Sequence, residues 1–137
     1  RQKYYATLTK AEVVKLEGNK FFKAGEMDKA IEKYTQALQL TKPEEAQVKA
    51  DLYTNRAMCH QQAWNYSAVV EDCDAALKLI PSNVKALVRR AQAFEALEKY
   101  KKSYADFQAA TILSPDLDVA IKGSTRVRNI LKKLGEL

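Results

Sequence analysis

Five polar side chains of this sequence are of the types that bind carboxylate groups. Lys15 and Asn19 are four residues apart, and Lys85 and Arg89 repeat that spacing later in the chain. Residues four apart on a helix share one face, so each pair would present its polar groups together. Asn55 precedes Arg89 by one period of an internal repeat (89 − 55 = 34). Lysine and arginine hold carboxylate oxygens and amides bridge a peptide backbone, so the set suits a carboxylate-bearing peptide.

The same interval recurs through the central part of the chain. It relates Ala57 to Ala91 (91 − 57 = 34) and Pro81 to Pro115 (115 − 81 = 34). A more divergent copy precedes these two, with Gly18 matching Ala57 at a slightly larger offset (57 − 18 = 39). A fixed period in this range indicates stacked helical hairpins, whose concave face is lined by the first helix of each pair. The five polar residues all fall on first helices, so we expect them to converge on one groove.

The apolar periodicity and the capping signals predict seven helices. Thr9 with Glu12 forms a capping-box pattern, Pro43 suits a first helical position, and Ser82 is a candidate N-cap. An apolar stripe including Ile121 and Leu134 would let the last helix cap the array. The expected helices span roughly 10–24, 27–41, 44–63, 66–79, 83–97, 100–113 and 117–134. We expect one all-α domain over residues 1–137, with repeats at about 11–43, 50–83 and 84–117 and a capping helix at about 117–134.

The composition argues against several classes of function. The chain has 137 residues, of which 23 are basic and 17 acidic, and its net charge is +6. This balance favours an acidic partner. Both signs are spread along the chain and no nucleic-acid-binding motif is present, so we do not expect nucleic acid as the ligand. No apolar run approaches the length of a membrane span.

The sequence contains no recognisable catalytic constellation. Cys59 and Cys73 are well separated along the chain, without a CxxC motif, and there is one histidine. This is neither a disulfide framework nor a zinc site, and it fits a reducing compartment. No nucleophile–base pair, metal-ligand cluster or phosphate loop is visible. We therefore expect a binding domain rather than an enzyme, with no metal and no cofactor.

Three segments carry a resemblance to a known family. They read KLEGNKFFKAGEMDKAIEKYTQAL, LYTNRAMCH and VKALVRRAQAFEALEKY. The pattern KxxxN, N and KxxxR in successive repeats resembles the dicarboxylate clamp of co-chaperone tetratricopeptide repeat (TPR) domains, and the likeness covers about residues 11–115. The resemblance implies a right-handed superhelical solenoid of three hairpins plus a capping helix.

The same resemblance implies a partner and a role for each clamp residue. The partner would be the C-terminal tail of cytosolic heat-shock protein 90 (Hsp90) and/or heat-shock protein 70 (Hsp70), which ends in Glu-Glu-Val-Asp. Lys15, Asn19, Asn55 and Lys85 would hold the terminal carboxylate and the Asp side chain. Arg89 would contact the penultimate stretch of the peptide or one of its acids. A cytoplasmic adaptor domain within a longer parent protein is implied.

Four further residues are candidates for lining the groove. Phe22 and Met58 fall beside Asn19 and Asn55, where they form either an apolar pocket for the peptide or ordinary packing between helices. Gln92 and Glu95 share the face of Arg89 and could select what precedes the two glutamates.

The residues leave two questions open. A scaffold that binds a folded partner through a surface outside the clamp is the alternative function. The sequence does not decide between the two heat-shock chaperones, because that choice depends on the peptide upstream of the shared acids, and its local similarities to different co-chaperones conflict.

Overall fold

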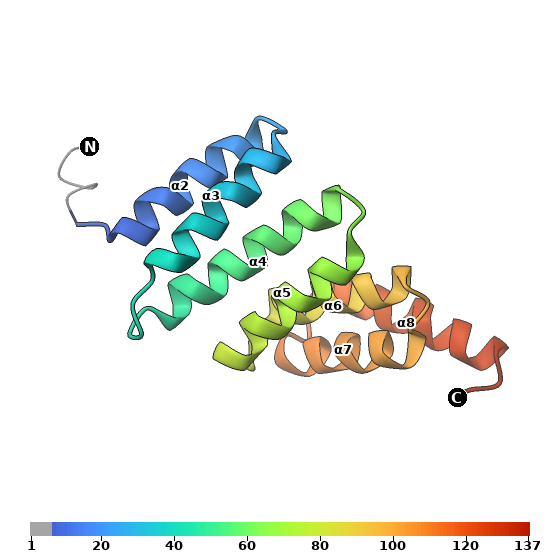
Figure 1. Ribbon diagram of the computed structural model, residues 1–137. Helices are drawn as coiled ribbons and strands as arrows, with labels where there is room; N and C mark the ends of the chain where they lie inside the picture. The colour runs from blue at the N-terminus through green and yellow to red at the C-terminus, as the bar shows by residue number, and fades with distance from the viewer. Residues whose placement is uncertain (1–6) are drawn as a thin grey trace.

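The computed structural model describes residues 7–137, so the first six residues of the expected domain lie outside it. The described range forms seven helices and no strand, stacked as an array of hairpins (Figure 1). The helices are α2 (Lys10–Lys23), α3 (Met27–Leu40), α4 (Ala46–Gln62), α5 (Tyr66–Leu79), α6 (Val84–Ala96), α7 (Tyr100–Leu113) and α8 (Asp118–Lys133). The expected all-α class is therefore confirmed. No helix of the described range is long and apolar enough to cross a bilayer.

The first helices of the three hairpins are neighbours. Each helix packs against the next one along the chain, and α4 also contacts α2 and α6. Small residues at the crossings permit this close approach. At Gly18, for example, an added Cβ would lie 2.6 Å from the ring of Tyr34 on the facing helix. The packing thus places α2, α4 and α6 side by side.

The helix starts differ from expectation at two of the predicted signals. The capping box is confirmed, since the Glu12 amide donates to Thr9 Oγ1 at 3.2 Å and the Thr9 amide donates to Glu12 Oε1 at 3.1 Å. The N-cap of α6 is Asn83 and not Ser82, because the Asn83 side chain accepts from the Ala86 amide at 3.1 Å. Asparagine caps at least as well as serine, so local chemistry could not separate the two.

Pro43 does not open a helix. The amide of Lys42 donates to the Glu45 carboxylate at 3.0 Å, and the Glu45 amide donates to the Lys42 carbonyl at 2.9 Å. These bonds close a turn around Pro43, so α4 begins at Ala46 instead of residue 44.

The capping helix α8 buries only part of the expected stripe, since Leu131 lies inside whereas Ile121 and Leu134 do not. Its buried residues are Ala120, Gly123, Val127 and Leu131. Ile121 and Leu134, expected on the inner face, are 42% and 54% exposed. The cause is Gly123, where the ring of Phe107 lies so close that an added Cβ would meet it at 2.4 Å. Contact with this ring brings Gly123 to the inner face of α8, together with Ala120, Val127 and Leu131.

We expect Gly123→Ala to destabilise the domain by about 1–3 kcal/mol, because the added methyl group overlaps the fully buried Phe107 ring. Alanine is otherwise the better helix former by about 1 kcal/mol, so the sign of the effect reports the packing. Urea denaturation measures it. Thr125→Ala, on the exposed side of the same helix, is the control for propensity. A Gly123→Ala variant as stable as that control would contradict the packing argument.

Candidate peptide-binding groove

The five predicted polar residues lie on the three neighbouring first helices. Lys15 and Asn19 are on α2, Asn55 is on α4, and Lys85 and Arg89 are on α6. Lys85 is exposed, and the other four are partly buried. Since α4 contacts both α2 and α6, a ligand lying across these helices can reach side chains from all three.

Asn19 is held in one orientation by two hydrogen bonds. The Tyr34 hydroxyl donates to Asn19 Oδ1 at 2.5 Å, and Asn55 Nδ2 donates to the same oxygen at 3.4 Å. Burial raises the pKa of Tyr34, which keeps its hydroxyl protonated and able to donate. Because the oxygen of Asn19 is occupied, its Nδ2 amide is the group left to donate to a ligand.

Among the residues that the structure describes, the three cations of the set have no acidic partner. Across residues 7–137, Lys15, Lys85 and Arg89 form no ion pair, and their side chains make no hydrogen bond. The Nε atom of Arg89 is also buried without a hydrogen-bond partner. Burial lowers the pKa of Arg89 from its ordinary value. A buried charged donor without a partner is unfavourable, and a bound carboxylate would satisfy it.

The neighbouring arginine is fully engaged. Arg90 donates from Nε and Nη2 to the two carboxylate oxygens of Asp106, both at 2.8 Å, and from Nη1 to Asp74 at 2.8 Å. Hydrogen bonding to Asp106 raises the pKa of Arg90. Arg56 makes the same two-pronged contact with Asp72 one repeat earlier, at 2.9 and 2.6 Å.

These Arg–Asp pairs join the two helices of a hairpin, and the sequence analysis missed them. The repeated spacing is their signal, because the arginine precedes the aspartate by the same interval in both copies (72 − 56 = 16; 106 − 90 = 16). Tyr34, which orients Asn19, left no such signal, since the later repeats place cysteine and phenylalanine at its position.

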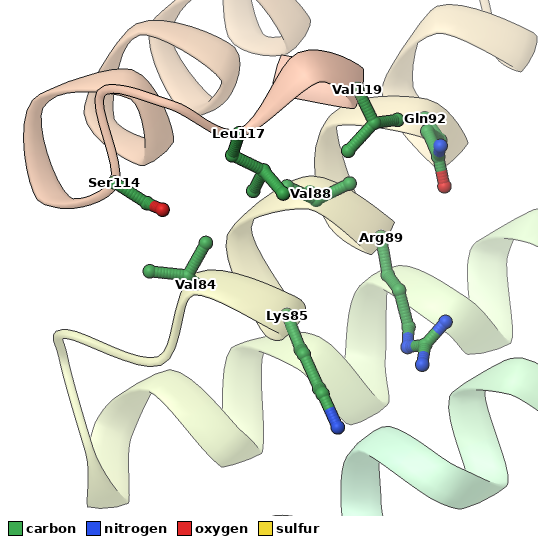
Figure 2. A pocket seen from close by; sticks show the side chains of 8 residues that line it. All are labelled: Val84, Lys85, Val88, Arg89, Gln92, Ser114, Leu117 and Val119. Carbon is green, nitrogen blue, oxygen red and sulfur yellow. The ribbon is translucent and has the colours of Figure 1, made fainter.

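An open pocket of about 380 Å³ adjoins the two cations of α6. Its apolar floor comes from α6 and the α7–α8 turn. Figure 2 shows Lys85 and Arg89 leaving α6 on one side, away from the apolar group formed by Val84, Val88 and Leu117. The residues that line the pocket are Val84, Lys85, Val88, Arg89, Gln92, Ser114, Leu117 and Val119.

The four candidate groove-lining residues have different surroundings. Phe22 packs against the buried cluster of the first hairpin, and Met58 is partly buried on α4. Gln92 lines the pocket, and its Oε1 accepts from Gln61 Nε2 at 3.3 Å. Glu95 accepts two bonds from Arg126 of α8, at 2.6 and 2.8 Å. That ion pair links the capping helix to α6.

The two cysteines are packing residues in this fold. Cys59 and Cys73 are both free and buried, and burial raises their pKa values to about 11 and about 12. Both side chains therefore remain thiols at neutral pH. The described part of the chain contains no group of three or more His, Cys, Asp or Glu residues that could hold a metal ion.

Stacked helical hairpins whose first helices present unpaired cations beside amide groups define a peptide-binding repeat domain. No family model matches the chain. The human mitochondrial import receptor subunit TOM34 is 45% identical over 131 residues, which are 90% of this chain and 41% of that protein. The first TPR domain of Spaghetti (RPAP3), solved with the HSP90 peptide SRMEEVD, is 32% identical with a TM-score of 0.83, covering 90% of this chain and 94% of that one.

The second TPR domain of human RPAP3, solved with the HSP70 peptide SGPTIEEVD, is 31% identical with a TM-score of 0.78, covering 86% of this chain and 94% of that one. The chain belongs to the tetratricopeptide repeat family, in the clamp-type group of co-chaperone domains. It spans less than half the length of the first curated relatives that it matches.

Proposed function

We propose that this domain binds the C-terminal Glu-Glu-Val-Asp peptide of Hsp90 and/or Hsp70 through a dicarboxylate clamp. In this proposal Lys15, Asn19, Asn55 and Lys85 hold the terminal carboxylate and the aspartate side chain. Arg89 binds the stretch that precedes them. The domain is then a cytoplasmic co-chaperone adaptor within a longer protein, and it recruits a chaperone rather than catalysing a reaction.

The observation that carries the proposal is the contrast between the groove and the opposite side of the same helices. Arg56 and Arg90 are neutralised by Asp72 and Asp106. Arg89, one residue from Arg90, has a buried Nε donor without a partner. Unsatisfied donors of this kind are rare in folded proteins, and an anionic ligand supplies the missing acceptor.

We expect the peptides SRMEEVD and SGPTIEEVD to bind, and the same peptides with an amidated C-terminus to lose nearly all affinity. Amidation removes one negative charge and leaves the donors of Asn19 and Asn55 facing a neutral group. Isothermal titration of acid and amide forms measures the loss, and the ratio between the two acid forms names the preferred chaperone. Raised salt should weaken the acid forms, because opposite charges steer and hold the complex.

The alternative function predicts the opposite result. A scaffold that uses a surface outside the clamp would bind acid and amide forms equally or not at all. Its partner would then be retained by clamp variants such as Lys85→Ala.

A further inference from the structure

One edge of the array joins segments that are distant in the sequence. The turns after α2, α4 and α6 follow one another along this edge, which ends at the C-terminal end of α8 (Figure 1). The Gln61–Gln92 hydrogen bond of 3.3 Å connects the last turn of α4 with the C-terminal half of α6. The ion pair of 3.6 Å between Lys101 Nζ and Glu136 connects the start of α7 with the chain after α8. The α4–α5 turn, the α6–α7 turn and the end of α8 therefore follow one another in series along this edge.

The α4–α5 turn carries Trp64 in a conformation that does not favour it. Trp64 has φ 63° and is 79% exposed. At the matching position of the first hairpin (64 − 39 = 25) the chain has Gly25, with φ 78°. Glycine adopts this left-handed region freely, whereas a bulky side chain there is strained. Glu98, at the matching position of the third hairpin (98 − 34 = 64), has the same conformation with φ 59°, so the turn itself imposes it. What is particular to Trp64 is that a large apolar ring stands there mostly exposed, which calls for a role outside the fold.

Lysines dominate the neighbouring part of this edge. Five exposed lysines lie at the start of α7 and at the end of α8. The acidic residues of the same region are Glu98 and Glu136, and Glu136 forms an ion pair with Lys101. Leu134, 54% exposed, lies in the same segment as two of the lysines. We call this surface the lysine edge, and it consists of Trp64, Lys99, Lys101, Lys102, Lys132, Lys133 and Leu134.

We propose that the lysine edge docks the domain on an anionic lipid bilayer. Lysines near a bilayer surface are attracted to anionic headgroups, and their long stems reach across a shallow interface. Tryptophan concentrates at the membrane–water interface, where the apolar ring and the polar N–H both find suitable surroundings. Trp64 and Leu134 would enter this interfacial layer beside the lysines.

Two features favour a bilayer over an acidic protein as the occupant. The hollow between the α6–α7 turn and the C-terminal end is lined by Glu98, Glu136, Tyr100 and three of the lysines, so a partner's apolar anchor residue would be surrounded by charged groups there. The cations of the lysine edge are lysines, which act as point charges, whereas arginine forks suit the directed pairing of a protein interface. The edge also lies at the helix ends, which leaves the groove formed by α2, α4 and α6 open to a peptide.

The test uses the tryptophan itself, because Trp64 is the one tryptophan of the chain. Vesicles of 70:30 phosphatidylcholine and phosphatidylserine should shift its emission to the blue and co-sediment with the domain, whereas pure phosphatidylcholine vesicles should not. Lys99→Glu/Lys132→Glu should lower the partition coefficient by more than roughly tenfold, since each lysine contributes roughly fivefold. Trp64→Gly should lower it several-fold while the fold is retained, because glycine suits this turn.

Lys42→Glu/Lys78→Glu is the matched control. It changes the net charge equally, but its lysines are exposed near the opposite ends of the helices, before α4 and at the end of α5. This control should keep at least half of the wild-type partitioning. Equal losses in the two double variants, unchanged binding of Trp64→Gly, or absent binding to the anionic vesicles would each overturn the proposal. Titration of the same variants with the peptide SRMEEVD tests the proposed clamp separately. Their peptide affinity should be unchanged, because no residue of the lysine edge belongs to the clamp.

Discussion

Replacing Arg89 by alanine is expected to weaken binding of the peptide SRMEEVD by about 2–5 kcal/mol, which is roughly thirtyfold or more. The reason is that Arg89 holds a charged donor, partly buried and without an internal partner, at the place where the ligand's acids are expected. Its loss removes the attraction and leaves a buried acid of the ligand unpaired. Isothermal titration against wild type measures the effect, and Lys85→Ala should behave similarly.

The stability of the Arg89→Ala variant is the second half of this prediction. Because Arg89 is desolvated without forming an ion pair, its removal should leave the unfolding midpoint unchanged or slightly raised. A variant that loses binding only because it unfolds would show a lowered midpoint. Retained affinity in a folded Arg89→Ala variant would exclude the proposed clamp.

Removing Asp106 is expected to lower the free energy of unfolding by about 3 kcal/mol. Asp106 accepts two bonds from Arg90, and the two side chains are 8% and 24% exposed. Asp106→Ala would leave the guanidinium largely buried with only the outer Asp74 as partner. Because Arg90 retains some solvent contact, the expected loss lies at the lower end for buried pairs. Urea denaturation gives the value.

Asp74→Ala is the matched control for this second prediction. Asp74 bonds to the same guanidinium at 2.8 Å, but its side chain is 49% exposed. Surface ion pairs contribute little, so the expected loss is below about 1 kcal/mol. Equal effects of the two substitutions would mean that the Arg90–Asp106 contact is not a buried element of the fold. Peptide affinity should be preserved in whatever fraction of either variant remains folded.

The two adjacent arginines of α6 have different roles. Arg90 stabilises the hairpin formed by α6 and α7, because Asp106 stands opposite it. Arg89 lies one residue earlier on the same helix and faces the groove, where no carboxylate of residues 7–137 accompanies it. The helical rotation of about 100° between consecutive residues is the geometric reason for this difference.

The sequence by itself determined the repeat, the seven helices of residues 7–137 and the residue types of the proposed clamp. A regular period with small residues at matching positions, such as Ala57 and Ala91, permits few packings other than stacked hairpins. The KxxxN and KxxxR spacings then place their polar groups on shared helix faces. These features could be predicted because they depend on local periodicity and on side-chain chemistry.

Only the tertiary structure decided how those residues are supported. It showed that Tyr34 orients Asn19, that Asp106 engages Arg90, and that Arg126 of α8 engages Glu95. Within the described part of the chain, it also left the buried Nε of Arg89 without a hydrogen-bond partner. The structure also showed that Asn83, and not Ser82, caps α6. It oriented α8 so that Gly123 packs against the ring of Phe107. Each outcome depends on the distance between side chains from different helices, and spacing along one chain does not contain that distance.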